Sequence, residues 1–110
     1  MGYIIGGNER ETDEEGFLLE PDYSDEAASA IAAAEGIELT EDHWAVIRYM
    51  REQYREHGRT PNFRNMLKDI TDSVLTGADS KRLYDLFPAG PARQAAKVAG
   101  LPKPYGKGGY

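Results

Sequence analysis

Four arginines between residues 48 and 59 are the side chains whose spacing most directly suggests chemistry. They follow one another at intervals of three, four and four residues, which places them on successive turns of one helix. A row of guanidinium groups can bind an anion, a phosphate backbone or an acidic protein partner. The alternative is local pairing, because Glu52 lies four residues from Arg48 and Glu56 lies beside Arg55. The residues of this possible anion or nucleic-acid stripe are Arg48, Arg51, Arg55 and Arg59.

Groups that commonly serve as catalysts or metal ligands are scarce elsewhere. His43 and His57 lie fourteen residues apart, which is too far along one helix to share a metal ion. The sequence contains no cysteine, no phosphate-binding loop and no serine–histidine–aspartate grouping with a supporting motif. We therefore expect no metal, no cofactor, no catalytic residue and no enzymatic activity of the chain's own.

The last ten residues have the composition of an arm that leaves a domain. Pro102 and Pro104 cannot extend a helix and favour extended backbone, while the glycines that follow add conformational freedom. Such a segment buries little surface, so we expect it to reach a partner. Residues 1–100 would form one domain and residues 101–110 a flexible arm. The side chains expected to bind the partner are Leu101, Pro102, Lys103, Pro104, Tyr105, Lys107 and Tyr110.

The elements that must position these groups are predicted to be mostly helical. Short β-prone runs at residues 3–5 and 17–19 predict a small N-terminal β-hairpin or three-strand meander. Ser24 is a suitable N-cap for a helix that continues to residue 34 and ends at Gly36. Thr40 should begin the long arginine-bearing helix, which should end near residues 57–58.

Three shorter helices are predicted after the long one. They span residues 61–72 with Pro61 at the first helical position, a stretch from Ser80 to about residue 87, and residues 92–99. The first of these and the long helix, joined by a turn containing Gly58, resemble a helix-turn-helix in outline. Specific DNA binding is one alternative function, although a DNA-binding domain usually shows a basic footprint and this chain is acidic overall.

The C-terminal sequence is similar to that of the DsrC/TusE/DsvC family of sulfur-relay proteins. That family typically ends in a stretch resembling GPAKQACKIAGLPKPTGCV, and this chain has GPARQA at residues 90–95 and KVAGLPKP at residues 97–104. The resemblance extends upstream through LYDLFP at residues 83–88, His43-Trp44, Arg48-Tyr49 and GFL at residues 16–18. It implies a DsrC-like fold with a C-terminal arm.

The positions of the family's cysteines depart from the pattern. The resemblance implies one sulfur-bearing cysteine near the arm tip and, in the DsrC branch, a second in the preceding helix. These positions are Lys107 and Ala96 here. Because a thiolate is the nucleophile in sulfur relay, neither side chain can hold a persulfide. An ordinary member whose cysteines had been replaced is a further alternative, but the additional residues 108–110 fit it poorly.

Composition and resemblance together give one leading hypothesis. Residues 1–60 carry 15 acidic and 5 basic side chains, whereas residues 61–110 carry 4 and 8, and this asymmetry can steer association. No run of about 18 apolar residues is present, so we expect no membrane span. We also expect a cytoplasmic protein and a monomer. We interpret it as a non-catalytic DsrC/TusE-like protein that binds or regulates dissimilatory sulfite reductase or TusBCD/DsrEFH-type sulfurtransferases without carrying sulfur.

Overall fold

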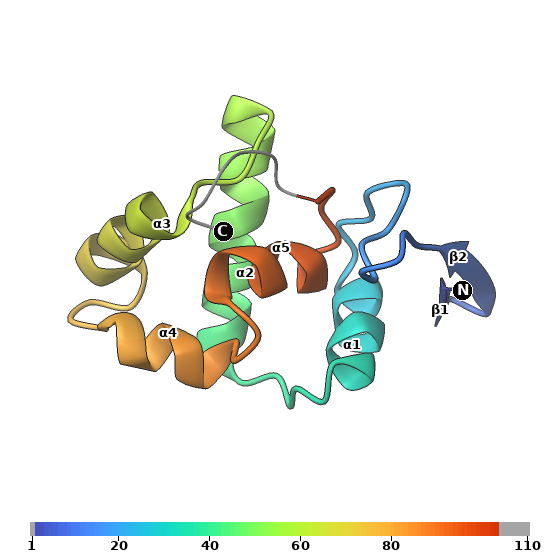
Figure 1. The fold of residues 1–110 in the computed structure, drawn as a ribbon, viewed down its shortest axis with the longest axis horizontal. Coiled ribbons are helices and arrows are strands. Elements are labelled where there is room, and N and C mark those ends of the chain that lie inside the picture. The colour runs from blue at the N-terminus through green and yellow to red at the C-terminus, as the bar shows by residue number, and fades with distance from the viewer. Residues whose placement is uncertain (1, 104–110) are drawn as a thin grey trace.

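The computed structural model describes residues 2–103 of the chain and confirms a mostly helical fold with a small N-terminal β-hairpin. Figure 1 shows α5 crossing the middle of the helical domain, with the hairpin beyond α1. The elements are β1 (Gly2–Ile5), β2 (Asn8–Glu11), α1 (Asp25–Ala34), α2 (Glu41–His57), α3 (Phe63–Asp69), the π-helical segment η1 (Ile70–Val74), α4 (Ser80–Leu86) and α5 (Pro91–Val98).

The hairpin uses a different second strand from the one predicted. Ile5 pairs with Asn8 across a two-residue turn, in which Gly6 and Gly7 adopt φ values of 61° and 81°. This left-handed pair of glycines suits a type I′ turn and sets the register of β2, despite the polar sequence of that strand. The apolar run at residues 17–19 forms only an isolated bridge, between Leu18 and Thr12. Phe17 and Leu18 are buried in the core instead.

The first two helices begin where their capping residues predict. The Ser24 hydroxyl accepts a hydrogen bond from the Ala27 amide at 3.0 Å, and the buried face of α1 is mostly alanine. At the start of α2, the Thr40 amide donates to His43 Nδ1 at 3.1 Å, while His43 Nε2 lies 2.8 Å from the Leu86 carbonyl oxygen. These two contacts fit the neutral Nε2–H tautomer, so His43 joins the start of α2 to the end of α4.

Two helix starts differ from the prediction by one or two residues. Asn62 caps α3 by accepting from the Asn65 amide at 2.9 Å, so Pro61 precedes the helix and is not its first residue. Asp79, and not Ser80, caps α4 by accepting from the Arg82 amide at 3.0 Å. In both helices the side-chain oxygen of an Asn or Asp residue takes the N-cap position in place of the residue predicted there. The final turns after α3 widen into η1, which the periodicity did not predict.

The short helix α5 is the centre of the core. It contacts α1, α2, α3 and α4, and six of its eight residues are buried. Pro91 starts it after Gly90, as the fixed φ of proline favours at a first helical position. Because both helix faces are covered, the alanines at 92, 95 and 96 allow the surrounding helices to approach closely. Within residues 2–103, no helix has the length and apolarity needed to cross a membrane.

Candidate functional site

The arm begins at a tightly built helix end, which we call the arm root and define as residues 99–101. Gly100 has a φ of +81°, its amide donates to the Lys97 carbonyl at 3.1 Å, and the Leu101 amide donates to the Ala96 carbonyl at 3.0 Å. This pair of bonds is a Schellman motif, which requires a left-handed residue and commonly places an apolar residue after it. Leu101 is fully buried.

A segment near the N-terminus holds the arm root from one side. The Asp22 amide donates to the Gly100 carbonyl oxygen at 2.9 Å. A Cβ at position 100 would collide with the Asp22 carbonyl oxygen, so only glycine fits this close approach of two backbones. The Asp22 carboxylate accepts from the Ser24 amide and pairs with Arg10 at 2.9 Å. The hydrogen bond from Ser24, together with the Arg10 charge, lowers the pKa of Asp22 below its ordinary value.

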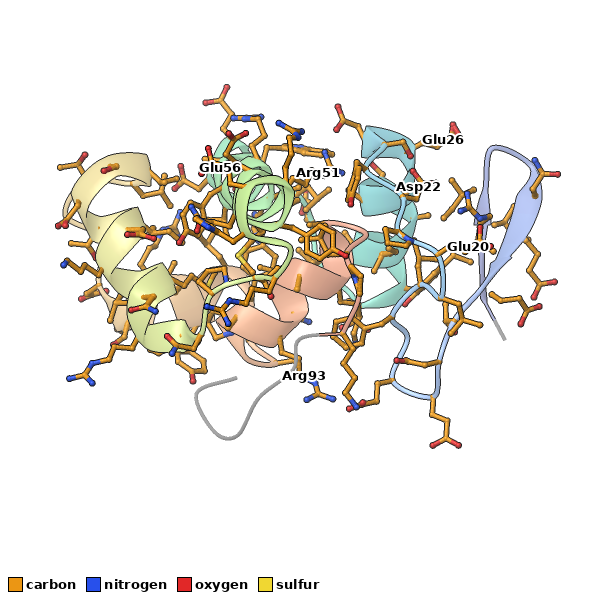
Figure 2. The ribbon with its side chains drawn as sticks, turned by 90° about the horizontal axis from the view of Figure 1, so that it is seen from above. Glu20, Asp22, Glu26, Arg51, Glu56 and Arg93 are labelled. Atoms are coloured by element: carbon orange, nitrogen blue, oxygen red, sulfur yellow. The ribbon has the colours of Figure 1, made fainter. Side chains whose placement is uncertain are left out.

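Arg51, on α2, also bonds the arm root. Its Nε donates to the Ala99 carbonyl oxygen at 3.2 Å, and its Nη2 donates to the Ser24 carbonyl oxygen at 2.9 Å. Its Nη1 donates to the Asp25 carboxylate at 3.1 Å. The Arg51 side chain is only 9% exposed, whereas Asp25 is 80% exposed. The two carbonyl bonds therefore matter more than the ion pair, which solvent screens at the Asp25 end. Figure 2 shows Arg51 and Asp22 on the same side of the molecule, with Arg93 on the opposite side of α5.

The turn at residues 13–17 contacts side chains before and after the arm root. The Glu15 carboxylate pairs with both Arg93 on α5 and Lys103, the last described residue of the arm. The Asp13 carboxylate fixes the turn by accepting from the amides of Glu15 and Phe17, at 2.8 and 3.0 Å. Arg93 and Lys97 lie 5.7 and 5.4 Å from the Phe17 ring centroid, within cation–π range. Two segments distant in sequence therefore bond the arm root directly, and the turn at residues 13–17 contacts the residues that flank it.

Of the two positions that the sequence resemblance assigns to the family's cysteines, the structure describes only Ala96, and the assignment stays a prediction. Ala96 is fully buried on α5, and its carbonyl oxygen accepts from Leu101. Of the predicted partner-binding residues, Leu101 is buried, Pro102 is partly buried and Lys103 is exposed. The others lie outside the residues that the structure describes: Pro104, Tyr105, Lys107 and Tyr110.

The structure does not keep the four predicted arginines together on one exposed stripe. At about 100° per residue, Arg51 is turned about 60° away from Arg48 on the helix, towards the face of Ile47. It is buried, whereas Arg48, Arg55 and Arg59 are exposed. Arg55 pairs locally with Glu52 at 3.0 Å, and Arg59 lies beyond the end of α2. Binding of an anion by the remaining exposed arginines stays a prediction.

Sequence reasoning missed Glu15, Asp22 and the anchoring role of Arg51. A signal for Arg51 was present, because it follows Ile47 by four residues and so lies on the apolar face of α2. The glycine–leucine pair after α5 is likewise a recognisable Schellman sequence. Glu15 and Asp22 carried no such local signal, since their partners are about 80 residues away in the sequence.

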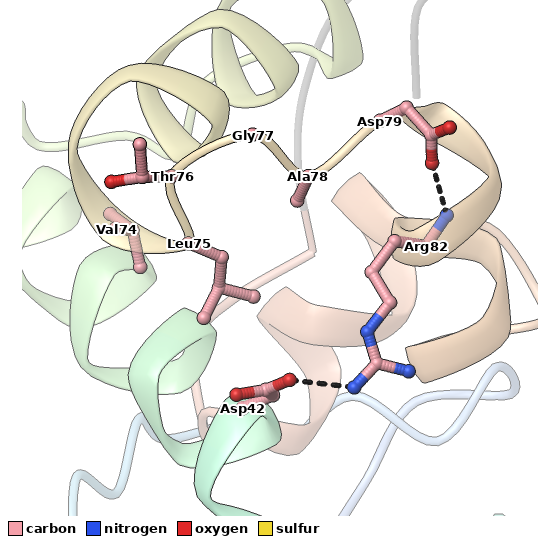
Figure 3. Close-up of a pocket in the computed structure, with 8 residues that line it drawn as sticks. All are labelled: Asp42, Val74, Leu75, Thr76, Gly77, Ala78, Asp79 and Arg82. Carbon is pink, nitrogen blue, oxygen red and sulfur yellow. Dashed lines mark hydrogen bonds and ion pairs between the residues drawn. The ribbon is translucent and has the colours of Figure 1, made fainter.

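Three further features bear on other expected functions. The α2–turn–α3 pair is present, but α3 spans only seven residues. Among residues 2–103, no group of three histidine or acidic side chains is placed to hold a metal ion. A hollow of about 630 Å³ lies between α2, the turn at residues 75–79 and α4, where Arg82 pairs with Asp42 at 2.6 Å (Figure 3). It contains none of the predicted site residues.

Comparisons with known proteins identify the family of this chain. The family model described as "DsrC like protein" matches residues 4–107. Sulfurtransferase TusE of Salmonella paratyphi A is 48% identical over 103 residues, covering 92% of this chain and 94% of that relative. The NMR structure of Allochromatium vinosum DsrC superimposes with a TM-score of 0.86 at 39% identity, covering 96% of this chain and 97% of the other.

A second solved structure extends the match to a subunit of a larger enzyme. The oxidised gamma-subunit of dissimilatory sulfite reductase (DsrC) from Archaeoglobus fulgidus has a TM-score of 0.84 and 36% identity, covering 96% of this chain and 98% of that one.

One expectation from the sequence is contradicted by these relatives. We expected no enzymatic activity, but the protein that is 48% identical along nearly the whole chain is named a sulfurtransferase. The expectation rested on the absence of recognisable catalytic groups in the sequence. That absence was not sufficient to exclude enzymatic activity, so the expectation was wrong. The family match, the relative and the solved structure together lead to one conclusion: the chain belongs to the DsrC/TusE family of sulfur-relay proteins.

Proposed function

We propose that this protein acts in sulfur relay by binding the relay's protein partners, without holding sulfur on its own side chains. The observation that carries the proposal is the arm root. Gly100 and Leu101 close α5 in a Schellman motif, and Arg51 and Asp22 each bond the root. A domain that specifies the departure of its arm this closely is suited to presenting that arm to a second protein.

The chemistry of the chain limits how it could take part. A persulfide forms on a thiolate, and the sequence has no cysteine. Ala96 offers only a buried methyl group. The proposed contribution is therefore to occupy, orient or regulate the proteins between which sulfur passes, in the cytoplasm and as a monomer. The proposed partners are a sulfurtransferase of the relay or a dissimilatory sulfite reductase, of which one solved relative is the gamma-subunit.

The first test asks whether sulfur is bound covalently. The full chain is incubated with a persulfide donor and a sulfurtransferase, and its intact mass is measured. We expect no change in mass, whereas the Lys107→Cys variant, which restores a thiol at the family position, should gain one sulfur atom. A gain of one sulfur by the unmodified chain would contradict the proposal.

The second test asks whether the arm mediates docking. Purified sulfurtransferase and sulfite reductase from the same host are titrated with the full chain and with a variant lacking residues 102–110. We expect one of these partners to bind the full chain and to bind the shortened chain at least about tenfold more weakly. Equal binding of both forms would show that the arm is not the docking element. Binding of neither partner would reject the proposed partner classes.

A further inference from the structure

The corner between α2 and α3 contains a polar pocket that the sulfur-relay proposal does not use. The pocket has a volume of about 320 Å³ and is formed by the end of α2, the connecting residues and one face of α3. In Figure 1 this corner is the turn that follows the upper end of α2. Its lining is almost entirely polar, and its volume falls at the lower end of the range for small-ligand sites.

Several polar side chains around this pocket have no partner in the described part of the chain. Thr60 is 4% exposed, and its Oγ1 is buried without any hydrogen bond. A buried hydroxyl without a partner is unfavourable and uncommon in folded proteins. The neighbouring Arg59 and Lys68 make no ion pair within residues 2–103, although both line the pocket. A ligand oxygen that entered here would supply the partner that these groups lack.

The charge around the pocket favours an anion. Arg59 and Lys68 are both cationic, and His57 adds an imidazole that, within residues 2–103, has one ion pair, a long one of 3.8 Å to Glu56. Asp69 supplies the one carboxylate in the lining. Its Oδ2 already accepts a hydrogen bond from the Tyr49 hydroxyl at 2.5 Å, which directs that oxygen towards Tyr49. Two permanent cations therefore face one engaged carboxylate.

The amide side chains in the lining add specificity to this charge. Gln53 reaches the pocket from the last turns of α2, and Asn65 reaches it from α3. Each carries a donor NH₂ group that can bond an oxyanion oxygen. Guanidinium, ammonium, amide and hydroxyl groups converging on a small volume form a donor set suited to a group with several acceptor oxygens.

We propose that this pocket binds a small ligand through a phosphate or sulfur oxyanion. Arg59 and Lys68 would meet its charge, and the Thr60 hydroxyl would donate to one of its oxygens. The site differs from the arm root in residues and position, so its occupancy can be tested independently of partner docking. It also differs from the predicted arginine stripe, with which it shares only Arg59.

The test is an NMR titration of the ¹⁵N-labelled full chain with sodium phosphate and, separately, with sodium sulfite, at ionic strength held constant by sodium chloride. We expect saturable shifts confined to amides of residues 53–69 with at least one anion. Lys68→Gln and Arg59→Gln should each weaken binding about tenfold. Arg64→Gln is the matched control, because Arg64 is an exposed cation on α3 outside the pocket lining, and it should leave affinity unchanged.

Thr60→Val separates ligand binding from folding. Valine keeps the shape and removes the unpartnered hydroxyl, so the urea midpoint should not fall while anion affinity does. Unchanged affinity in this variant would overturn the role of the hydroxyl. Shifts that never saturate, or an equal loss in Arg64→Gln and Lys68→Gln, would reduce the effect to general electrostatics and overturn the site. Saturation by a duplex oligonucleotide but by neither inorganic anion would also overturn the small-ligand proposal and favour a nucleic-acid backbone.

Discussion

Arg51 Nε and the Ala99 carbonyl oxygen lie 3.2 Å apart, so the middle of α2 is bonded directly to the residue from which the arm departs. The same guanidinium bonds the Ser24 carbonyl at the start of α1. One side chain therefore fixes the arm root relative to two helices. Lysine could not replace it, because a single ammonium cannot span three acceptors in the geometry of a planar guanidinium.

Arg51→Ala should destabilise the folded domain by about 1–3 kcal/mol, because the buried Ala99 carbonyl oxygen loses its donor, whereas the part-buried Ser24 carbonyl keeps its bond from the Ala28 amide. Arg48→Ala is the control, since Arg48 is an exposed arginine on the same helix, and its effect should stay within about 0.5 kcal/mol. Urea unfolding followed by circular dichroism measures both. Similar effects of the two substitutions would mean that the Arg51 contacts contribute little to stability.

Gly100→Ala should be among the most damaging single substitutions in the chain, at about 3–4 kcal/mol. The residue has a positive φ, and the added methyl group would collide with the Asp22 backbone. Gly36→Ala is a matched comparison, because Gly36 also has a positive φ but faces open space. It should lose only about 1–2 kcal/mol for the unfavourable backbone conformation. Equal losses would show that the backbones at Gly100 and Asp22 can move apart easily.

Removal of residues 102–110 should change the free energy of unfolding by no more than about 1 kcal/mol, because the ion pair of Lys103 with Glu15 is largely exposed. Removal of residues 101–110 should cost about 2–4 kcal/mol more, because Leu101 is fully buried. Thermal unfolding of the two shortened chains gives the comparison. If both were equally stable, Leu101 would not belong to the core.

Stability should fall at acid pH partly through Asp22, whose pKa is lowered in the folded state. Because the folded pKa lies below the unfolded value of about 3.9, the ionised carboxylate stabilises the fold above that pH. This contribution is lost as the pH falls through the folded pKa. Asp22→Asn should therefore flatten the decline in stability below about pH 4, measured by urea midpoints. Glu38→Gln, which alters an exposed carboxyl without an ion pair in residues 2–103, should keep the original slope.

The sequence predicted those elements whose determinants are local. Ser24 and Thr40 cap their helices as expected, because a cap depends on residues within one helical turn. The starts of α3 and α4 were misplaced because a second capping residue, Asn62 or Asp79, lies within two residues of the predicted cap and takes the N-cap position. β2 was missed because the turn of Gly6 and Gly7, and not the apolar content of the strand, determines the pairing.

The composition of the last ten residues predicts an arm, which stays a prediction, but it does not predict how residues 99–101 are held. Proline and glycine identify a segment that leaves a helix, and they do so within a few residues. The bonds from Arg51, Asp22 and Glu15 join residues that are far apart in sequence, so no local pattern reports them. The arginine spacing gave a wrong exposed stripe for a related reason. Intervals of three and four residues place side chains near one another on a helix, but they do not show which of them other elements bury.

The backbone bond between Asp22 and Gly100 ties a residue near the start of the chain to one near its end. The entropy cost of closing so long a loop falls when the helices between them have already packed. The arm root should therefore be among the last features to form as the protein folds. Only a chain whose whole domain has folded would then have a formed arm root. Partially folded chains would therefore not dock to the partner.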